Sequence, residues 1–344
     1  MRIGIVNDMP MAVEALRRVV AGVPEYQTAW IAYNGAEAVA KSAADPPDLI
    51  LMDLIMPVMD GVEATRRIMQ QSPCPILVVT ATVSGNASKV FDAMGHGALD
   101  AVNTPVLGLS GKAEGDSALL IKIATIGKLI GKHREPAAAK PARMPLHPAV
   151  ADSTTLIAIG ASTGGPLVIG KILAGLPPAL QAAVVIIQHV DVEFAPGLAS
   201  WLSEQSSLPV RTANEGDTPA KGKALLAATN DHLILTKSLS VSYTRDPKEF
   251  SYRPSADVFF KSVAAYWPGN AMGVLLTGMG RDGGHGLLAM RNRGWHTIAQ
   301  DRETSIVYGM PKMAAELNAA VEILPAEAIA PAIMKQLKRN GRTE

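Results

Sequence analysis

Leu156-Ile157-Ala158-Ile159-Gly160-Ala161-Ser162-Thr163-Gly164-Gly165 joins an apolar run to a helix-like stretch over 167–174. This order predicts a strand, a tight glycine turn and a helix. A serine on such a turn presents its hydroxyl beside backbone N–H groups that have no partner within the helix. The sequence Gly-x-Ser-x-Gly at 160–164 matches the nucleophile motif of hydrolases. A glycine turn after a strand is also typical of phosphate-binding loops.

The sequence around this turn continues the alternation of strand and helix, with a hairpin expected over 225–243. Such alternation predicts a doubly wound, three-layer α/β/α domain. The expected strands are 156–159, 183–187, 223–227, 233–236, 272–276 and 296–299, and the expected helices are 167–174, 195–203, 256–267, 283–293, 309–317 and 325–338.

The first part of the chain shows the same alternation in a shorter form. Its apolar runs and helical spacings predict a (βα)5 domain with a parallel sheet covered on both faces. The expected strands are 2–6, 28–32, 48–52, 76–80 and 98–102, and the expected helices are 12–21, 36–42, 61–70, 89–94 and 117–130.

Length and composition agree with two α/β domains. The 344 residues are 48% hydrophobic, and a change to proline-rich sequence predicts a linker over 126–152 between domains 1–125 and 153–344.

The formal net charge of +1 gives no reason to expect nucleic-acid binding. Polar residues follow Met1 too soon for a signal peptide, and no apolar run is long enough to span a bilayer. We therefore expect a cytoplasmic protein without direct membrane insertion.

Three polar residues of the second domain follow predicted strands. Ser162, His189 and Asp282 would meet at one sheet edge, because functional side chains gather at the carboxyl ends of parallel strands. Together they form the set of nucleophile, general base and orienting acid. Each also has a structural interpretation, because Ser162 and Asp282 could cap helices and His189 could bond locally. The chain order Ser, His, Asp disfavours the α/β-hydrolase fold.

The same rule locates a second site in the first domain. Asp8, Asp53, Thr80 and Thr104 follow strands there, and a structural interpretation of Asp53 is a cap on the next turn. Carboxylates at this edge suit Mg²⁺, and a carboxylate beside Mg²⁺ can accept a phosphoryl group.

Residues 1–125 resemble two-component receiver domains. The resemblance is carried by Met52-Asp53-Leu54-Ile55-Met56-Pro57-Val58-Met59-Asp60-Gly61. It implies that Asp53 is the phosphorylated residue, that Asp8 and Asp53 bind Mg²⁺, and that Thr80 and Thr104 are the receiver switch residues, with the Thr80 hydroxyl following the phosphoryl group. The chain departs from the receiver pattern at three positions: Asn7 replaces an acid, Thr104 replaces a lysine and Ala101 replaces an aromatic residue.

The second domain resembles CheB-type protein-glutamate methylesterases. The motifs that carry this resemblance are Ile159-Gly160-Ala161-Ser162-Thr163-Gly164-Gly165-Pro166, Gln188-His189, Arg253-Pro254-Ser255-Ala256-Asp257, Leu276-Thr277-Gly278-Met279-Gly280-Arg281-Asp282-Gly283 and Ala299-Gln300-Asp301. They imply hydrolysis of glutamyl methyl esters on chemoreceptor helices, deamidation of receptor glutamines, and a histidine kinase as phosphodonor. Thr163 and Met279 would supply the oxyanion donors, and the hydrolysis would need no cofactor. The receiver sequence is similar to the subgroup that serves Wsp-type surface sensing.

Two other function classes remain as alternatives. The first is a response regulator that acts by protein or DNA binding without catalysis. The lack of a recognisable recognition helix counts against DNA, and the Ser162, His189 and Asp282 set counts against a purely binding role. The second is a dinucleotide-binding oxidoreductase, but Ser162 stands where its fingerprint requires the middle glycine.

Overall fold

The computed structural model describes residues 1–80, 83–107, 113–114, 116–130, 154–248 and 253–340. The chain divides into two compact units, residues 1–135 and 136–344. The predicted linker over 126–152 lies outside the described residues from 131 onward, and the predicted boundaries at 125 and 152 stay predictions. None of the helices within the described ranges has both the length and the apolar character that crossing a bilayer demands.

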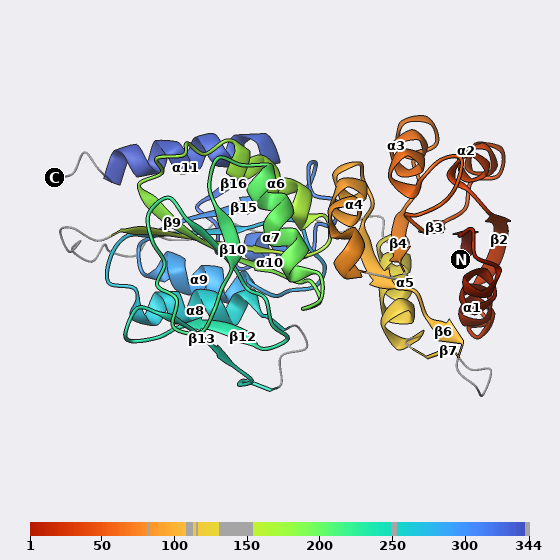
Figure 1. The fold of residues 1–344 in the computed structure, drawn as a ribbon. Helices are drawn as coiled ribbons and strands as arrows, with labels where there is room; N and C mark the ends of the chain where they lie inside the picture. The colour runs from red at the N-terminus through yellow and green to blue at the C-terminus, as the bar shows by residue number, and fades with distance from the viewer. Residues whose placement is uncertain (81–82, 108–112, 115, 131–153, 249–252, 341–344) are drawn as a thin grey trace. The chain divides into compact units, whose positions relative to one another are not determined.

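The first unit is a parallel five-stranded sheet in the order β2-β1-β3-β4-β5, with helices on both faces (Figure 1). This confirms the predicted (βα)5 fold. A short antiparallel pair, β6 (Val106–Leu107) and β7 (Ala113–Glu114), was not predicted. The sheet strands are β1 (Arg2–Val6), β2 (Gln27–Ala32), β3 (Leu49–Met52), β4 (Ile76–Thr80) and β5 (Asp100–Asn103), and the helices are α1 (Pro10–Ala21), α2 (Gly35–Ala44), α3 (Gly61–Gln71), α4 (Val83–Gly95) and α5 (Asp116–Ile130).

Local sequence explains how this unit brings the ends of β1 and β3 together. Every residue of β3 is buried, as expected for a central strand covered on both faces. Helices α1 and α5 pack on one face of the sheet through an apolar cluster that includes Leu16 and Ile123. Asp60 caps α3 by accepting a hydrogen bond from the Glu63 amide at 3.0 Å, and the Gly61 amide donates to the Leu54 carbonyl at 3.1 Å across the segment between β3 and α3.

The second unit contains a seven-stranded parallel sheet in the order β10-β11-β9-β8-β14-β15-β16, and a separate antiparallel pair, β12–β13. The strands are β8 (Thr155–Ala161), β9 (Ala182–Gln188), β10 (Val210–Thr212), β11 (Ala224–Leu226), β12 (His232–Leu235), β13 (Val241–Thr244), β14 (Ala271–Leu275), β15 (His296–Gln300) and β16 (Glu322–Leu324). The helices are α6 (Gly165–Ala174), α7 (Ala195–Glu204), α8 (Ala256–Tyr266), α9 (Gly284–Asn292), α10 (Met310–Glu316) and α11 (Ala326–Asn340).

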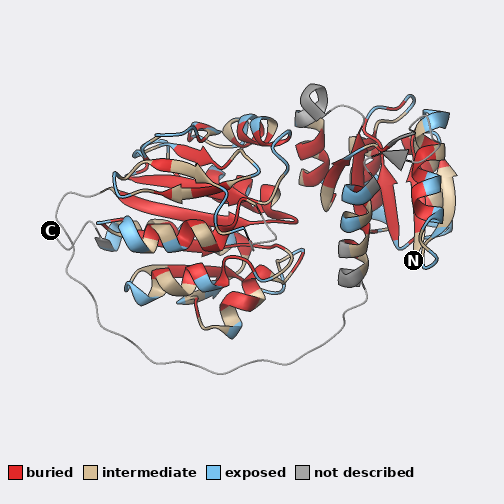
Figure 2. Ribbon diagram, turned by 90° about the horizontal axis from the view of Figure 1, so that it is seen from below, coloured by how far each residue is buried: buried red, intermediate tan, exposed pale blue. Residues whose placement is uncertain are grey.

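Helices cover both faces of this larger sheet, which confirms the predicted three-layer α/β/α arrangement (Figure 2). Helices α8, α9 and α10 share one apolar cluster with the sheet, and α6 packs against α7 and α11. The predicted hairpin was wrong in its first arm. Leu225 lies in β11, a wholly buried strand parallel to β9, and the antiparallel pair begins at His232. Strands β10 and β16 were missed because each has only three residues, one of them charged, whereas the equally short β11 is apolar throughout and was predicted.

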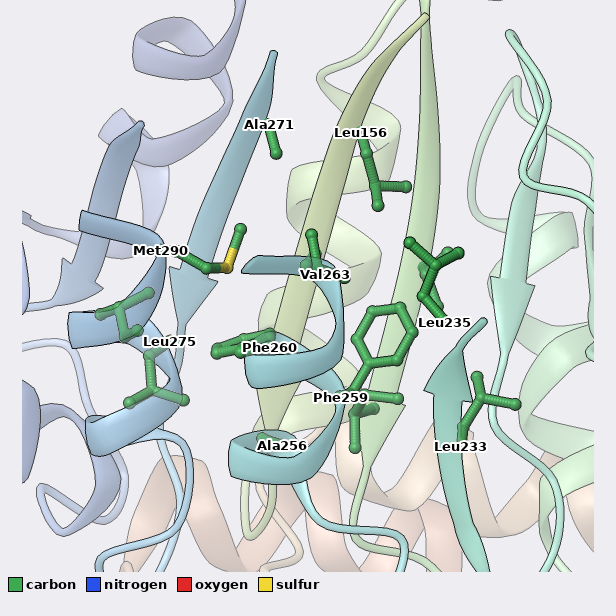
Figure 3. Packing of buried hydrophobic residues seen from close by; sticks show 14 of the residues in the cluster. Leu156, Leu233, Leu235, Ala256, Phe259, Phe260, Val263, Ala271, Leu275 and Met290 are labelled. Carbon is green, nitrogen blue, oxygen red and sulfur yellow. The ribbon is translucent and has the colours of Figure 1, made fainter. Parts of the chain in front are cut away.

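Helix α8 packs closely against the sheet near the predicted catalytic edge. Phe259 and Phe260 have no exposed surface, and they point from α8 toward β12 and β14 (Figure 3). Ala256, the first residue of α8, packs so closely on β8 that a Cβ at Gly160 would lie 2.8 Å from the Ala256 Cβ. The N-terminus of α8 is therefore held firmly against the sheet.

Candidate functional site

The predicted nucleophile lies on a tight turn between β8 and α6. Ser162 follows the last residue of β8 and is 9% exposed. Gly164 adopts a left-handed conformation with φ of 77°, which glycine accepts without strain. At Gly165 a side chain would overlap with Gln188 Oε1. The glycines are therefore required by the turn itself, and they leave Ser162 at the edge of the sheet.

His189 and Asp282 meet at this same edge. The His189 amide donates to the Ala161 carbonyl at 3.0 Å, so the histidine is held next to the nucleophile turn. Its Nε2 lies 2.8 Å from Asp282 Oδ2. Because an ionised carboxylate only accepts hydrogen bonds, the neutral ring carries its proton on Nε2 and its lone pair on Nδ1. Nδ1 is thus the basic atom of this histidine.

Asp282 is surrounded by hydrogen-bond donors. Ser255 Oγ donates to Oδ1 at 2.7 Å, and the amides of Ala256 and Asp257 donate to Oδ2 and Oδ1 at 2.7 and 3.1 Å. Burial by itself would raise the pKa of Asp282. The hydrogen bond and charge of His189 and the hydrogen bonds from Ser255 and Ala256 act against this effect of burial. Together these interactions lower the pKa of Asp282 below its usual 3.8. Asp282 is therefore a stabilised anion.

A second set of hydrogen bonds fixes the backbone around Ser162. Gln188 Nε2 donates to the carbonyl oxygens of Ser162 at 2.9 Å and His189 at 3.1 Å. Thr277 Oγ1 donates to the Thr163 carbonyl at 3.0 Å and accepts from the Val307 amide at 2.9 Å. These contacts join the nucleophile turn to the ends of β9 and β14.

The residues expected to bind an oxyanion lie beside this network. Thr163 is 7% exposed, and Met279 follows Gly278, whose amide donates to the Val307 carbonyl at 3.0 Å. Within the described part of the chain, no acceptor takes a hydrogen bond from the backbone N–H of Thr163 or Met279. The oxyanion role of these two N–H groups stays a prediction.

Sequence reasoning missed the roles of Ser255, Gln188 and Thr277. All three lie in motifs that carry the family resemblance, but spacing alone does not say where a hydroxyl or amide points. The signal that could have found two of them is position, because Gln188 ends the buried strand β9 directly before His189, and Thr277 follows the buried strand β14 by two residues.

In the first unit, Asp53 lies buried at the end of β3. Its Oδ1 accepts from the Leu54 amide at 2.7 Å and its Oδ2 accepts from Asn7 Nδ2 at 3.1 Å. The pKa of Asp53 is raised to about 6. Burial is the largest cause of this rise, the hydrogen bonds from the Leu54 and Ile55 amides lower the pKa, and the negative charge of Asp8 raises it. Ionising Asp53 is therefore unfavourable without a compensating cation.

The structure brings Thr80 and Thr104 together at the neighbouring strand ends. The Thr104 amide donates to the Thr80 carbonyl at 3.0 Å. Thr104 Oγ1 is buried and has no hydrogen-bond partner among the described residues.

Asp8, the other residue expected to bind Mg²⁺, is exposed. The described residues contain no group of three His, Cys, Asp or Glu side chains that could hold a metal ion. The mutual repulsion of Asp8 and Asp53 nevertheless fits a hard cation that keeps most of its waters.

Comparisons with known proteins assign both units. The family described as CheB methylesterase matches residues 157–333, and the family described as response regulator receiver domain matches residues 3–108. A Pseudomonas aeruginosa protein called protein-glutamate methylesterase/protein-glutamine glutaminase 3 is 56% identical over 333 residues, which cover 96% of this chain and 98% of that protein. A Mesorhizobium japonicum protein called protein-glutamate methylesterase/protein-glutamine glutaminase is 54% identical over 342 residues, covering 99% and 100%.

A solved structure is similar to the second unit. The crystal structure of the Thermotoga maritima CheB methylesterase catalytic domain is 32% identical, with a TM-score of 0.51, and covers 54% of this chain and 100% of that one. The fold and the two sites together define a receiver domain followed by a hydrolase unit with serine, histidine and aspartate at one sheet edge. The chain belongs to the CheB methylesterase family.

Proposed function

We propose that this protein hydrolyses glutamyl methyl esters on the cytoplasmic helices of chemoreceptors, releasing methanol, and that it deamidates receptor glutamines at the same site. The observation that carries the proposal is the 2.8 Å hydrogen bond between His189 and Asp282 beside the Ser162 turn. The names of the relatives support both activities. They also count against a regulator that acts by binding alone.

The first step is attack of Ser162 Oγ on the ester carbonyl carbon. His189 Nδ1 takes the hydroxyl proton, because the Asp282 carboxylate keeps the other ring proton on Nε2. Asp282 also stabilises the imidazolium that forms. The bond between the former carbonyl carbon and the methoxy oxygen then breaks, and His189 returns the proton to the departing methoxide, which leaves as methanol and leaves the glutamyl group on Ser162.

The negative charge on the carbonyl oxygen needs donors that are already in position. The backbone N–H groups of Thr163 and Met279 are proposed for this role. Thr277 supports the first of them by bonding the Thr163 carbonyl. Water then attacks the acyl-serine with His189 as base, which frees glutamate and Ser162. Starting from glutamine, the leaving group is ammonia and the other steps are the same.

For the receiver unit, the proposal is phosphorylation of Asp53 by a histidine kinase. Asp8 and Asp53 would hold Mg²⁺, and the ion would neutralise the charge of the phosphoryl oxygens. Thr80 and Thr104 would donate hydroxyls to the phosphoryl group, and the buried, unbonded Thr104 Oγ1 supports this. Phosphorylation of Asp53 would raise the activity of the esterase unit. The surface-sensing pathway stays a prediction from the receiver sequence.

The test is methanol release from methylated chemoreceptor. The intact protein, Ser162→Ala and His189→Ala are compared, with Ser206→Ala as a control because its hydroxyl bonds only locally, to the Leu208 carbonyl. We expect both site variants to lose nearly all activity and the control to keep it. A small-molecule phosphodonor should raise the rate of the intact protein but not that of Asp53→Asn. Equal inactivity of all proteins, with or without phosphodonor, would contradict the proposal.

A further inference from the structure

We propose that Ser255 is a positioning residue of the esterase site, whose hydroxyl holds the Asp282 carboxylate in the orientation that receives His189 Nε2. The proposal rests on the proposed hydrolysis and gives a role to the Arg253-Pro254-Ser255-Ala256-Asp257 motif. Ser255 touches neither substrate nor reacting atoms in this account. It acts through Asp282 alone.

The contacts divide between the two carboxylate oxygens. Oδ2 accepts from His189 Nε2 at 2.8 Å and from the Ala256 amide at 2.7 Å. Oδ1 accepts from Ser255 Oγ at 2.7 Å and from the Asp257 amide at 3.1 Å. Within the described ranges, Ser255 is the side chain that donates to Oδ1. A carboxylate turns easily about its last torsion, so the short bond from Ser255 to Oδ1, together with the two backbone amides, keeps Oδ2 facing the histidine.

Ser255 is itself fixed from two sides. It is the N-cap of α8, where its hydroxyl accepts from the Val258 amide at 3.3 Å, and it has no exposed surface. Its amide donates to His232 Nδ1 at 3.2 Å, and His232 Nε2 lies 3.2 Å from the Pro247 carbonyl oxygen. Burial is the main cause that lowers the pKa of His232, which keeps the ring neutral and lets Nδ1 accept.

The core packing of α8 makes this anchor rigid. Phe259 and Phe260 follow Ser255 by one turn and are fully buried, with Phe259 on the side of Leu233 and Leu235 of β12 and Phe260 on the side of Leu275 of β14 (Figure 3). The N-terminus of α8 also favours negative charge because of the helix dipole. Ser255 therefore combines a helix cap with a contact to the catalytic acid.

The other ionisable groups near Asp282 are the same in the variants that we propose. They are His189 on the edge after β9, His232 on β12 and Asp257 on α8. Lys261 and His285 act in turn on Asp257, and Arg253 and Asp231 act on His232. A change of pH profile in a Ser255 variant therefore reports the lost hydroxyl.

The test compares Ser255→Ala with Ser262→Ala in the full-length protein. Ser262 lies on the same helix, and its hydroxyl donates to the Phe259 carbonyl at 2.7 Å and accepts from the Leu235 amide at 2.8 Å, but it does not contact Asp282. We expect both variants to melt at lower temperature. Ser255→Ala alone should lose about 10- to 100-fold in kcat with KM unchanged, because a hydrogen bond to a charged group is lost.

Two further readouts separate positioning from a purely structural role. Without the hydroxyl, the Asp282 anion holds a proton more readily, so the acidic limb of the rate profile should move to higher pH in Ser255→Ala and stay in place in Ser262→Ala. The proton on His189 Nε2 should give a low-field NMR resonance that shifts or broadens only in the Ser255 variant. This resonance needs no turnover, so it tests Ser255 even if the intact protein releases no methanol.

Ser255→Gly guards against loss of folding, because glycine at an N-cap costs only a few tenths of a kcal/mol relative to serine. It should show the same kcat loss as Ser255→Ala. The proposal is overturned if both Ser255 variants keep kcat within about twofold of the intact protein, or if Ser262→Ala loses as much. An unchanged His189 resonance in Ser255→Ala overturns it as well.

Discussion

Asp53 and Asp282 occupy equivalent places in the two units, yet their surroundings act on them in opposite directions. Both are buried near the carboxyl end of a central parallel strand. For Asp53, burial and the nearby Asp8 charge outweigh the Leu54 and Ile55 amides and raise the pKa to about 6. For Asp282, the hydrogen bond and charge of His189, together with the bonds from Ser255 and Ala256, outweigh burial and lower the pKa.

The difference shows that the position of a strand end brings functional groups together but does not decide whether a carboxylate there is stabilised as an anion. The hydrogen-bond donors and charges around each carboxylate decide that. Asp282 is already stabilised as an anion, which suits a group that orients a base through a whole reaction cycle. Asp53 is an uncompensated carboxylate, which suits a group that receives a cation and a phosphoryl group from outside.

The largest expected effect concerns the catalytic acid. Asp282→Asn should lower kcat of methanol release by about 10⁴-fold with little change in KM, because an amide can stabilise the wrong ring tautomer and carries no charge for the imidazolium. Glu204→Gln, an exposed acid at the end of α7, is the control and should keep full activity. A loss of less than about tenfold in Asp282→Asn would show that the tautomer is fixed by another group.

The next effect concerns the network behind the nucleophile turn. Thr277→Val should lower kcat by about tenfold or more, because the Thr163 carbonyl loses its hydroxyl partner. Thr297→Val is a matched control, since its equally buried hydroxyl also joins a carbonyl and an amide, those of Ala319 and Val321. Both variants should melt lower by similar amounts. Equal kcat values for the two would contradict a role for Thr277.

A smaller effect is expected at the phosphorylation site. Asn7→Asp adds a carboxylate next to Asp53 and keeps the acceptor for the Met9 amide, which Asn7 Oδ1 binds at 2.8 Å. Calorimetry should show Mg²⁺ binding tighter by about tenfold than in the natural chain. Asn34→Asp, which adds the same charge at the N-cap of α2, should leave Mg²⁺ affinity nearly unchanged. Unaltered affinity in Asn7→Asp would mean that the ion binds elsewhere.

The smallest expected effect, on thermal stability, has opposite signs at the two carboxylates. Because the folded pKa of Asp53 is raised, its ionisation weakens folding above about pH 6, and this cost disappears as the pH falls toward 3.8. Asp53→Asn should therefore melt a few degrees higher than the natural chain at pH 8, with the gain shrinking by pH 4.

The folded pKa of Asp282 is lowered, so its ionisation contributes stability above the ordinary pKa and loses it in acid. Asp282→Asn should melt lower at pH 8, and less so as the pH falls. Changes of melting temperature with the same sign in Asp53→Asn and Asp282→Asn at pH 8 would contradict the proposed difference between the two carboxylates.

The sequence predicted both folds, and it placed Ser162, His189 and Asp282 after strands that the structure contains, because buried strands and glycine turns leave a strong local pattern. The catalytic roles of the three residues stay predictions. The sequence missed β10 and β16, whose three residues depend on neighbouring strands for their structure. It also missed Ser255 and the use of His189 Nε2 by Asp282. These depend on side-chain directions that only the packing of α8 against the sheet determines.

The most direct test of the contrast is a carboxyl-carbon NMR titration of Asp53 and Asp282 in the intact protein without Mg²⁺, each assigned from its asparagine variant. We expect the Asp53 signal to titrate near pH 6 and the Asp282 signal below 3.8. If both titrate together in the ordinary range, or if Asp282 titrates above Asp53, the donors around the two carboxylates do not set their chemistry and the account is wrong.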